Sequence, residues 1–165
     1  MRTLAPLFLL LAALTIGCGK PGDSPAPTGS AGHDANGKAR YTAVCTVGMV
    51  ADIVREVGGD RVLATNIIGE GVDPHVYTPT SSDVKNLMAA DVVFFSGLNL
   101  EGKMGATLQK VKAQGKKPVI AVTELIPEDF LLAPPEFAGH HDPHVWMDPN
   151  GWRQAVQVVE NALCD

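Results

Sequence analysis

The stretch Asp91-Val92-Val93-Phe94-Phe95-Ser96 decides the fold of this chain. Its four central residues form a continuous apolar run, which is typical of a strand that is buried on both faces. Strands of that kind lie in parallel sheets, where helices cover both sides. The run therefore predicts a strand inside a helix-covered parallel sheet.

The segments on either side of this run alternate between strand and helix patterns. The expected strands span residues 41–47, 61–68, 91–96 and 118–122. The expected helices span residues 49–57, about 80–90, 100–114 and 151–163. Strands that alternate with helices imply right-handed crossovers. The expected fold class is therefore α/β, a parallel-sheet, Rossmann-like lobe of about four strands with flanking helices.

Length and composition suit one domain and narrow the possible partners. The chain has 165 residues, a hydrophobic fraction of 45% and a formal net charge of −5. A core of useful size is possible without a disulfide scaffold. The mild acidity is compatible with a cation, and it gives no clustered basic face, so no nucleic-acid partner is expected.

The N-terminus has the pattern of an export signal. A positive charge at Arg2 precedes an apolar run over residues 4–16, which is too short for the roughly 20 residues that span a bilayer. The run ends in a segment that resembles a bacterial lipoprotein box, with Cys18 as the lipidated residue. We therefore expect a lipoprotein signal peptide over residues 1–18 and a lipid anchor in the membrane. The alternative is a simple cleaved signal in which Cys18 occurs by chance.

Residues 19–39 are rich in Gly, Pro, Ser and Ala and contain almost no large apolar side chain. Such a segment buries too little to offset its ordering entropy, so it is interpreted as a flexible tether. The folded lobe is expected over residues 40–165. Two cysteines lie in that lobe. Cys45 and Cys164 could pair in an oxidising compartment, but Cys45 lies in an apolar run, which favours a buried free thiol.

Two pentapeptides repeat one pattern, namely Asp73-Pro74-His75-Val76-Tyr77 and Asp142-Pro143-His144-Val145-Trp146. Proline stiffens the loop just before each histidine, which lowers the ordering cost of ligand capture. Imidazole is a common ligand for divalent transition metals, and the carboxylate could orient the ring or a backbone group. The following aromatic residue could shield the site from water. A single motif of this kind also fits a solvated histidine beside a turn, but its repetition favours a metal site at His75 and His144.

The chain resembles the zinc/manganese substrate-binding lipoproteins of bacterial metal ABC importers. Three stretches carry the resemblance: Val72-Asp73-Pro74-His75-Val76-Tyr77-Thr78-Pro79-Thr80, Ser96-Gly97-Leu98-Asn99-Leu100-Glu101-Gly102-Lys103-Met104 and Asp142-Pro143-His144-Val145-Trp146-Met147-Asp148-Pro149. The resemblance implies a two-lobed receptor with the metal between the lobes, two ligands coming from each. His75 and His144 match the ligands of the first lobe. The other two, a His or Glu and an Asp, belong to a second lobe.

Family members are about twice as long in their folded part, so the expectation is that this chain holds the N-terminal lobe only, as a truncated gene, a partial reading or a fragment. The resemblance implies an extracytoplasmic, lipid-anchored receptor that captures Mn²⁺ or Zn²⁺ and delivers it to an ABC permease without catalysing a reaction. Two alternatives are kept, an exported metal-dependent enzyme and an adhesion or interaction lipoprotein.

Several other residues that stand out in the sequence are expected to have structural roles or to be solvent-exposed. His33, His140 and His141 are expected to be solvated. Glu101 is expected to open a helix and to face the positive end of its dipole. The remaining carboxylates that stand out are expected to be caps or surface charges, namely Asp83, Glu124 and Asp148. Trp146 and Trp152 are expected to be packing residues.

Overall fold

The computed structural model describes residues 32–164 of the chain. The expected signal peptide, Cys18 and most of the expected tether therefore lie outside the described residues. Four parallel strands form one sheet in the order β2-β1-β3-β4. The strands are β1 Tyr41–Cys45, β2 Val62–Asn66, β3 Val92–Phe95 and β4 Val119–Ala121. The predicted α/β class with a parallel sheet is confirmed, and each strand is two or three residues shorter than expected.

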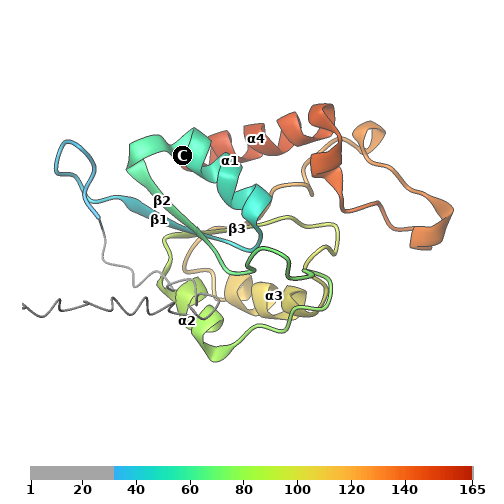
Figure 1. Cartoon of the computed structure of the whole chain (residues 1–165), viewed down its shortest axis with the longest axis horizontal. Coiled ribbons are helices and arrows are strands. Elements are labelled where there is room, and N and C mark those ends of the chain that lie inside the picture. Colours follow the sequence, from blue (N-terminus) through green and yellow to red (C-terminus); the bar gives the residue numbers. More distant parts are fainter. Residues whose placement is uncertain (1–31, 165) are drawn as a thin grey trace, which may run out of the picture.

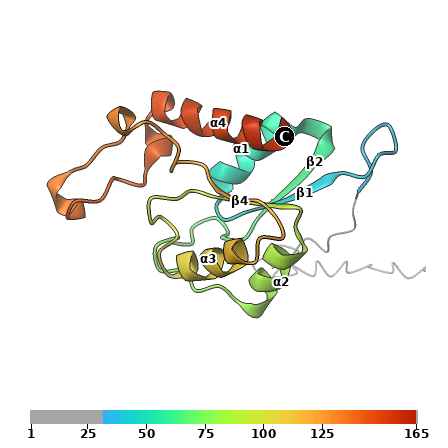
Figure 2. The same cartoon turned by 180° about the vertical axis from the view of Figure 1, so that it is seen from behind.

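Helices cover both faces of this sheet. They are α1 Gly48–Gly58, α2 Ser81–Ala89, α3 Gly105–Ala113 and α4 Pro149–Cys164. Helices α1 and α4 lie on one face, and α2 and α3 lie on the other (Figures 1 and 2). All four residues of β3 are buried as a result, as the apolar run predicts. No helix within residues 32–164 is long and apolar enough to cross a membrane.

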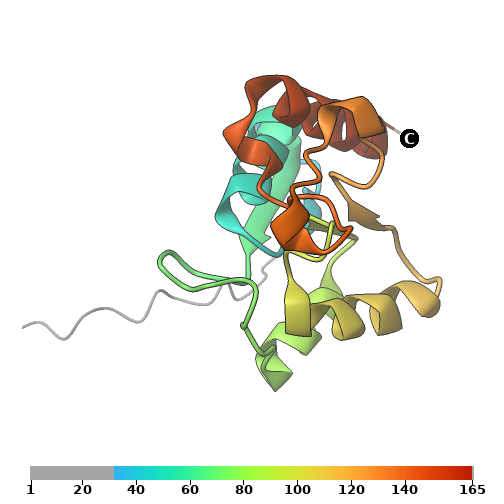
Figure 3. The same cartoon turned by 90° about the vertical axis from the view of Figure 1, so that its right-hand side faces the viewer.

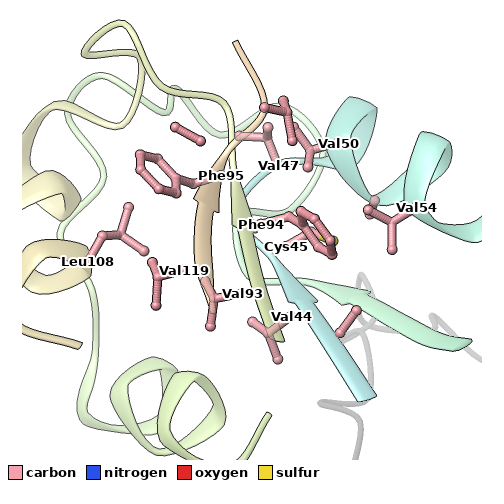
Figure 4. Packing of buried hydrophobic residues seen from close by; sticks show 14 of the residues in the cluster. Val44, Cys45, Val47, Val50, Val54, Val93, Phe94, Phe95, Leu108 and Val119 are labelled. Carbon is pink, nitrogen blue, oxygen red and sulfur yellow. The ribbon is translucent and has the colours of Figure 1, made fainter. Parts of the chain in front are cut away.

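The core is built around β3 and β1. Phe94 of β3 is fully buried, and it lies with Cys45 beside Val50 and Val54 of α1 (Figure 4). On the opposite face Leu108 packs toward the sheet (Figure 4). Within the described residues Cys45 and Cys164 form no disulfide, which agrees with the interpretation of Cys45 as a buried free thiol. Burial raises the pKa of the Cys45 thiol to about 12.

A side-chain clamp joins the first and third strands at their amino ends. The Oδ2 atom of Asp91 accepts hydrogen bonds from the backbone N–H of Thr42 at 2.8 Å and from its hydroxyl at 2.6 Å. The backbone N–H of Asp91 donates in return to the carbonyl oxygen of Thr42 at 2.9 Å. These bonds fix β1 beside β3, although the two residues lie 49 positions apart in the sequence.

Two helix starts differ from the prediction. The expected helix over residues 100–114 begins only at α3, after the 3-10 turn η2 Gly102–Met104. Positive φ angles at Gly97 (97°), Leu98 (49°) and Asn99 (65°) make a turn just before the expected helix start. Inside the expected helix, Glu101 has a ψ angle of 20°, which lies outside the right-handed helical region, so the helix begins only after this residue. Helix α4 begins two residues early because Pro149 is well suited to the first helical position.

The loops that leave the carboxyl ends of the strands lie at one end of the molecule, which faces the viewer in Figure 3. At the other end, a turn with a bridge between His33 and Ala39 precedes β1. The Oδ1 atom of Asp34 closes that turn by accepting from the backbone N–H groups of Asn36 and Lys38. The loops that follow the strands are therefore at the opposite end of the sheet from the turn that precedes β1.

Candidate metal centre

The two histidines of the repeated motif meet in space. The Nε2 atoms of His75 and His144 lie 3.5 Å apart, although the residues are 69 positions apart in the sequence. Their ring centroids are 5.5 Å apart, with an interplanar angle of 62°. His75 lies in the loop after β2, and His144 lies in the long segment after β4. Both segments follow the carboxyl ends of parallel strands, where ligands of such sheets bind.

The loop that carries His75 is tied down on both sides of the histidine. The Oδ1 atom of Asp73 accepts the backbone N–H of His75 at 2.9 Å. The hydroxyl of Tyr77 donates to Oδ2 of Asp83 at 2.7 Å, and Asp83 forms a capping box with Thr80 at the start of α2. Asp83 is thus a cap, as expected. The hydroxyl of Tyr77 is directed to α2, so this residue anchors the loop.

The Tyr77 hydroxyl is also a poor acid in this setting. Burial and the hydrogen bond to the Asp83 carboxylate raise the pKa of Tyr77 to about 12. The phenol therefore remains a hydrogen-bond donor at neutral pH, and its bond to Asp83 persists there.

His144 is held more completely than His75. The Oδ1 atom of Asp142 accepts the backbone N–H of His144 at 2.9 Å and lies 2.5 Å from its ring Nδ1. This contact leaves Nε2 as the nitrogen that faces His75. The Trp146 ring meets the His144 ring edge-on at 5.2 Å, and Phe137 lies at 6.5 Å. The backbone N–H of His144 is the main cause that lowers the pKa of Asp142, with the ring of His144 adding to it.

A third loop, residues 96–102, lies behind His75. A Cβ atom on Gly102 would overlap the carbonyl oxygen of His75, so the two backbones are in direct contact. Next to Gly102, Glu101 is only 2% exposed. Its Oε1 atom accepts the Thr46 hydroxyl at 2.6 Å and the Ser96 N–H at 2.6 Å, and its Oε2 atom accepts the Gly97 N–H at 3.2 Å.

The expectation for Glu101 is therefore wrong. Its side chain makes no cap bond at a helix start and turns into the interior instead. Burial raises the pKa of the Glu101 carboxyl, and the donors from Thr46, Ser96 and Gly97 offset part of that rise. The charge pattern near a helix start suggested a dipole role, but only the tertiary fold brings Thr46 to this carboxylate.

The other histidines are not part of the pair. His141 places Nε2 at 3.3 Å from the Glu128 carboxylate, and His140 is exposed. Within residues 32–164, no group of three or more His, Cys, Asp or Glu side chains could hold a metal ion. The described part of the chain thus brings together two imidazoles whose Nε2 atoms face each other, which is an incomplete ligand set for a tetrahedral metal.

Known proteins share both the sequence and the fold of this chain. The manganese-binding lipoprotein MntA of Bacillus subtilis (strain 168) is 41% identical over 157 residues, which are 95% of this chain and 47% of the relative. The zinc-binding protein TroA of Treponema pallidum (strain Nichols) is 40% identical over 131 residues, which are 79% of this chain and 41% of the relative.

Two solved structures extend the comparison. The periplasmic zinc-binding protein TroA of Treponema pallidum superposes with a TM-score of 0.70 and 40% identity over 76% of this chain and 44% of its own. Zn(II)-bound AdcA of Streptococcus pneumoniae superposes with a TM-score of 0.64 and 27% identity over 76% of this chain and 26% of its own.

The chain spans less than half the length of the curated relatives MntA and TroA. Residues 43–165 match the family described as zinc-uptake complex component A periplasmic, or ZnuA. With that match and the two relatives at about 40% identity, the chain belongs to the ZnuA family of metal-binding proteins.

Proposed function

We propose that this chain is the N-terminal lobe of an extracytoplasmic receptor that captures Mn²⁺ or Zn²⁺ and delivers it to an ABC permease. The observation that carries the proposal is the convergence of the His75 and His144 Nε2 atoms at 3.5 Å. The relatives add support, since one is named manganese-binding and another zinc-binding. The receptor binds and releases its ion and does not transform it.

The separation of the two nitrogens suits a shared ion. Zn–N bonds of about 2.0–2.1 Å in a tetrahedral site place two ligand nitrogens roughly 3.3–3.4 Å apart. The 3.5 Å between the Nε2 atoms is close to that value, so one ion can bind both rings with little movement. Asp142 supports this arrangement because it occupies Nδ1 of His144 and so directs Nε2 to the ion.

The rest of the ligand set is proposed to come from outside the described residues. A second lobe that supplies a His or Glu and an Asp would complete four ligands. More oxygen ligands would favour Mn²⁺, and more nitrogen ligands would favour Zn²⁺. We further propose that Cys18 carries the lipid anchor and residues 19–39 form the tether, so that the lobe stays near the permease in the membrane.

Family membership favours this function over the two alternatives considered for the sequence. The relatives named above are binding proteins, and several others are named as substrate-binding lipoproteins of metal ABC transporters. An exported metal-dependent enzyme would need a general base beside an open metal position, and an adhesin would bind its partner without the two histidines.

Titration calorimetry of the full chain with Zn²⁺ and Mn²⁺ tests the metal site. The wild type is expected to bind one ion weakly, with water in the remaining positions, and His75→Ala and His144→Ala are each expected to abolish binding. His140→Ala is the matched control, because His140 is exposed and outside the pair, and it should bind as the wild type does. Submicromolar one-to-one binding that survives His144→Ala would contradict the assignment.

The lipid anchor needs a separate test. Expression in a bacterial host with a labelled fatty acid should label the wild type and leave Cys18→Ser unlabelled. Equal labelling of both proteins would contradict Cys18 as the modified residue without affecting the metal site.

A further inference from the structure

The two histidines differ in what orients them. The ring of His144 is fixed by the Asp142 carboxylate and by the Trp146 ring. The ring of His75 has no such support, because Asp73 bonds only the backbone N–H. Within residues 32–164, the one hydrogen-bond contact of the His75 ring is with His144 itself, and the side chain is exposed. The direction of the His75 ring must therefore be set through its backbone.

The backbone of His75 rests on Gly102. A Cβ at Gly102 would overlap the His75 carbonyl oxygen and would lie 3.1 Å from the carbonyl carbon and 3.4 Å from Cα. Gly102 does not have a positive φ, so the need for glycine here is one of space and not of backbone angle. Since the clashing atoms belong to the backbone, the His75 loop would have to move as a unit to accept a side chain.

Gly102 is in turn held by a stiff support. Residues 97–99, shortly before it, have positive φ angles, which Gly97 and Asn99 adopt readily and which are unfavourable for Leu98. The buried Glu101 carboxylate binds the N–H groups of Ser96 and Gly97, which open this turn. Its bond to the Thr46 hydroxyl fastens the turn to the segment after β1.

We propose that Gly102 is a positioning residue for His75, and that Glu101 keeps Gly102 in place. The proposal rests on the proposed role of His75 as a metal ligand. The carboxyl ends of β1 and β3 fix the support, the support fixes the His75 carbonyl, and the carbonyl fixes the direction of the imidazole toward His144. The His144 half of the site does not depend on this support.

The test compares Gly102→Ala with Gly105→Ala in the full chain. Gly105 lies three residues further on at the start of α3, and a Cβ there would meet nothing within 4 Å. Each protein is measured by Zn²⁺ calorimetry, by urea unfolding without metal, and by the nuclear Overhauser effect between the His75 and His144 ring protons without metal. Gly102→Ala is expected to lose the ring-to-ring signal and to bind Zn²⁺ at least about tenfold more weakly, while Gly105→Ala keeps both.

The two readouts separate this inference from the proposed function. If Gly102→Ala keeps the ring-to-ring signal at wild-type strength, the positioning role is overturned, whatever the metal affinity. If the wild type binds no Zn²⁺, the proposed function fails, but loss of the ring-to-ring signal in Gly102→Ala still supports the positioning role.

A second variant covers the case in which Gly102→Ala does not fold. Glu101→Gln keeps the shape of the buried side chain but replaces the Oε2 acceptor of the Gly97 N–H with a donor. Folded Glu101→Gln protein should show a weaker ring-to-ring signal than the wild type. An unchanged signal in that variant would overturn the role given to the support.

Discussion

Asp73 and Asp142 occupy the same place in the two motifs, but they hold their histidines differently. Each accepts the backbone N–H of the histidine two residues later at 2.9 Å. Only Asp142 also reaches the ring, at 2.5 Å from Nδ1. The aromatic residues diverge in the same way, since Trp146 meets the His144 ring whereas Tyr77 bonds Asp83. One sequence pattern therefore gives two unequal halves of a site.

This inequality predicts unequal effects of removing the carboxylate charge. Asp142→Asn is expected to weaken Zn²⁺ binding by about tenfold, because a carboxylate that hydrogen-bonds and orients a coordinating imidazole commonly contributes that much. Asp73→Asn retains an oxygen for the backbone bond and should change the affinity much less. Calorimetry on both variants decides the matter, and equal losses would show that Asp142 has no special effect on the ring.

The buried carboxyl of Glu101 predicts a pH dependence of stability. Because burial raises its pKa, the folded protein holds this proton more tightly than the unfolded chain. Its contribution to the free energy of unfolding is therefore complete below the ordinary pKa of 4.5 and is lost as the pH rises through the raised value. Other carboxyls, such as Asp34, have lowered pKa values and act in the opposite direction.

The difference between wild type and Glu101→Gln isolates this effect. In urea unfolding from pH 4 upward, the free energy of unfolding of the wild type should fall relative to that of Glu101→Gln as the pH rises. Glu124→Gln is the control, since Glu124 is exposed, and it measures the effect of removing a surface carboxylate. A flat difference for Glu101→Gln would mean that Glu101 titrates alike in both states.

Among the elements, α2 supports the candidate site, because the His75 loop ends on it. Thr80 and Asp83 close its first turn as a capping box. At its other end the ammonium of Lys117, just before β4, donates to the carbonyl oxygens of Leu87 at 3.2 Å and Met88 at 2.7 Å, and also to that of Ala90. A nine-residue helix is thus fastened at both termini.

Lys117→Met should therefore destabilise the lobe. The expected loss is about 1–2 kcal/mol in the free energy of unfolding, because a cation at a helix C-terminus and its bonds to the last carbonyls are removed. Lys116→Met is the matched control, since Lys116 is exposed and makes no such bond among the described residues. Chemical denaturation measures both, and an equal effect of the two substitutions would rule out capping by Lys117.

The parts of the fold that could be predicted from the sequence are those that depend on local sequence patterns. The apolar run of β3 and the positions of helices α1 and α2 each depend on residues close together in the chain, and they were predicted to within one residue at each end. The late start of α3, the inward turn of Glu101 and the contact between Gly102 and His75 depend on segments that meet only in the folded lobe. The meeting of His75 and His144 was accessible because parallel topology brings strand ends to one edge.

At the scale of the whole molecule, Cys45 reports on the integrity of the core. Its thiol is fully buried, and its pKa of about 12 leaves almost no reactive thiolate at neutral pH. Cys164 is exposed at the end of α4. The two cysteines should therefore differ sharply in reactivity although neither is bridged within the described residues.

In a Cys18→Ser background, a thiol reagent at pH 8 should modify Cys164 rapidly and Cys45 only as fast as the lobe opens. Adding Cys164→Ser should remove the fast phase and leave the slow one. Because the folded-state pKa of Cys45 is raised, its contribution to stability is also lost as the pH rises from about 9 to 12. Fast modification of Cys45 in native protein would mean that the core around β3 opens readily.

The clamp between Thr42 and Asp91 has a consequence for how the chain reaches its folded state. Because β1 pairs with β3 across 49 residues, that pairing must close a long loop before its bonds form. Contacts of such high sequence separation slow folding, so this lobe should refold more slowly than a helical bundle of its size. Of the three strand pairings in the sheet, the one between the two central strands closes the longest loop, so we expect it to form late in folding.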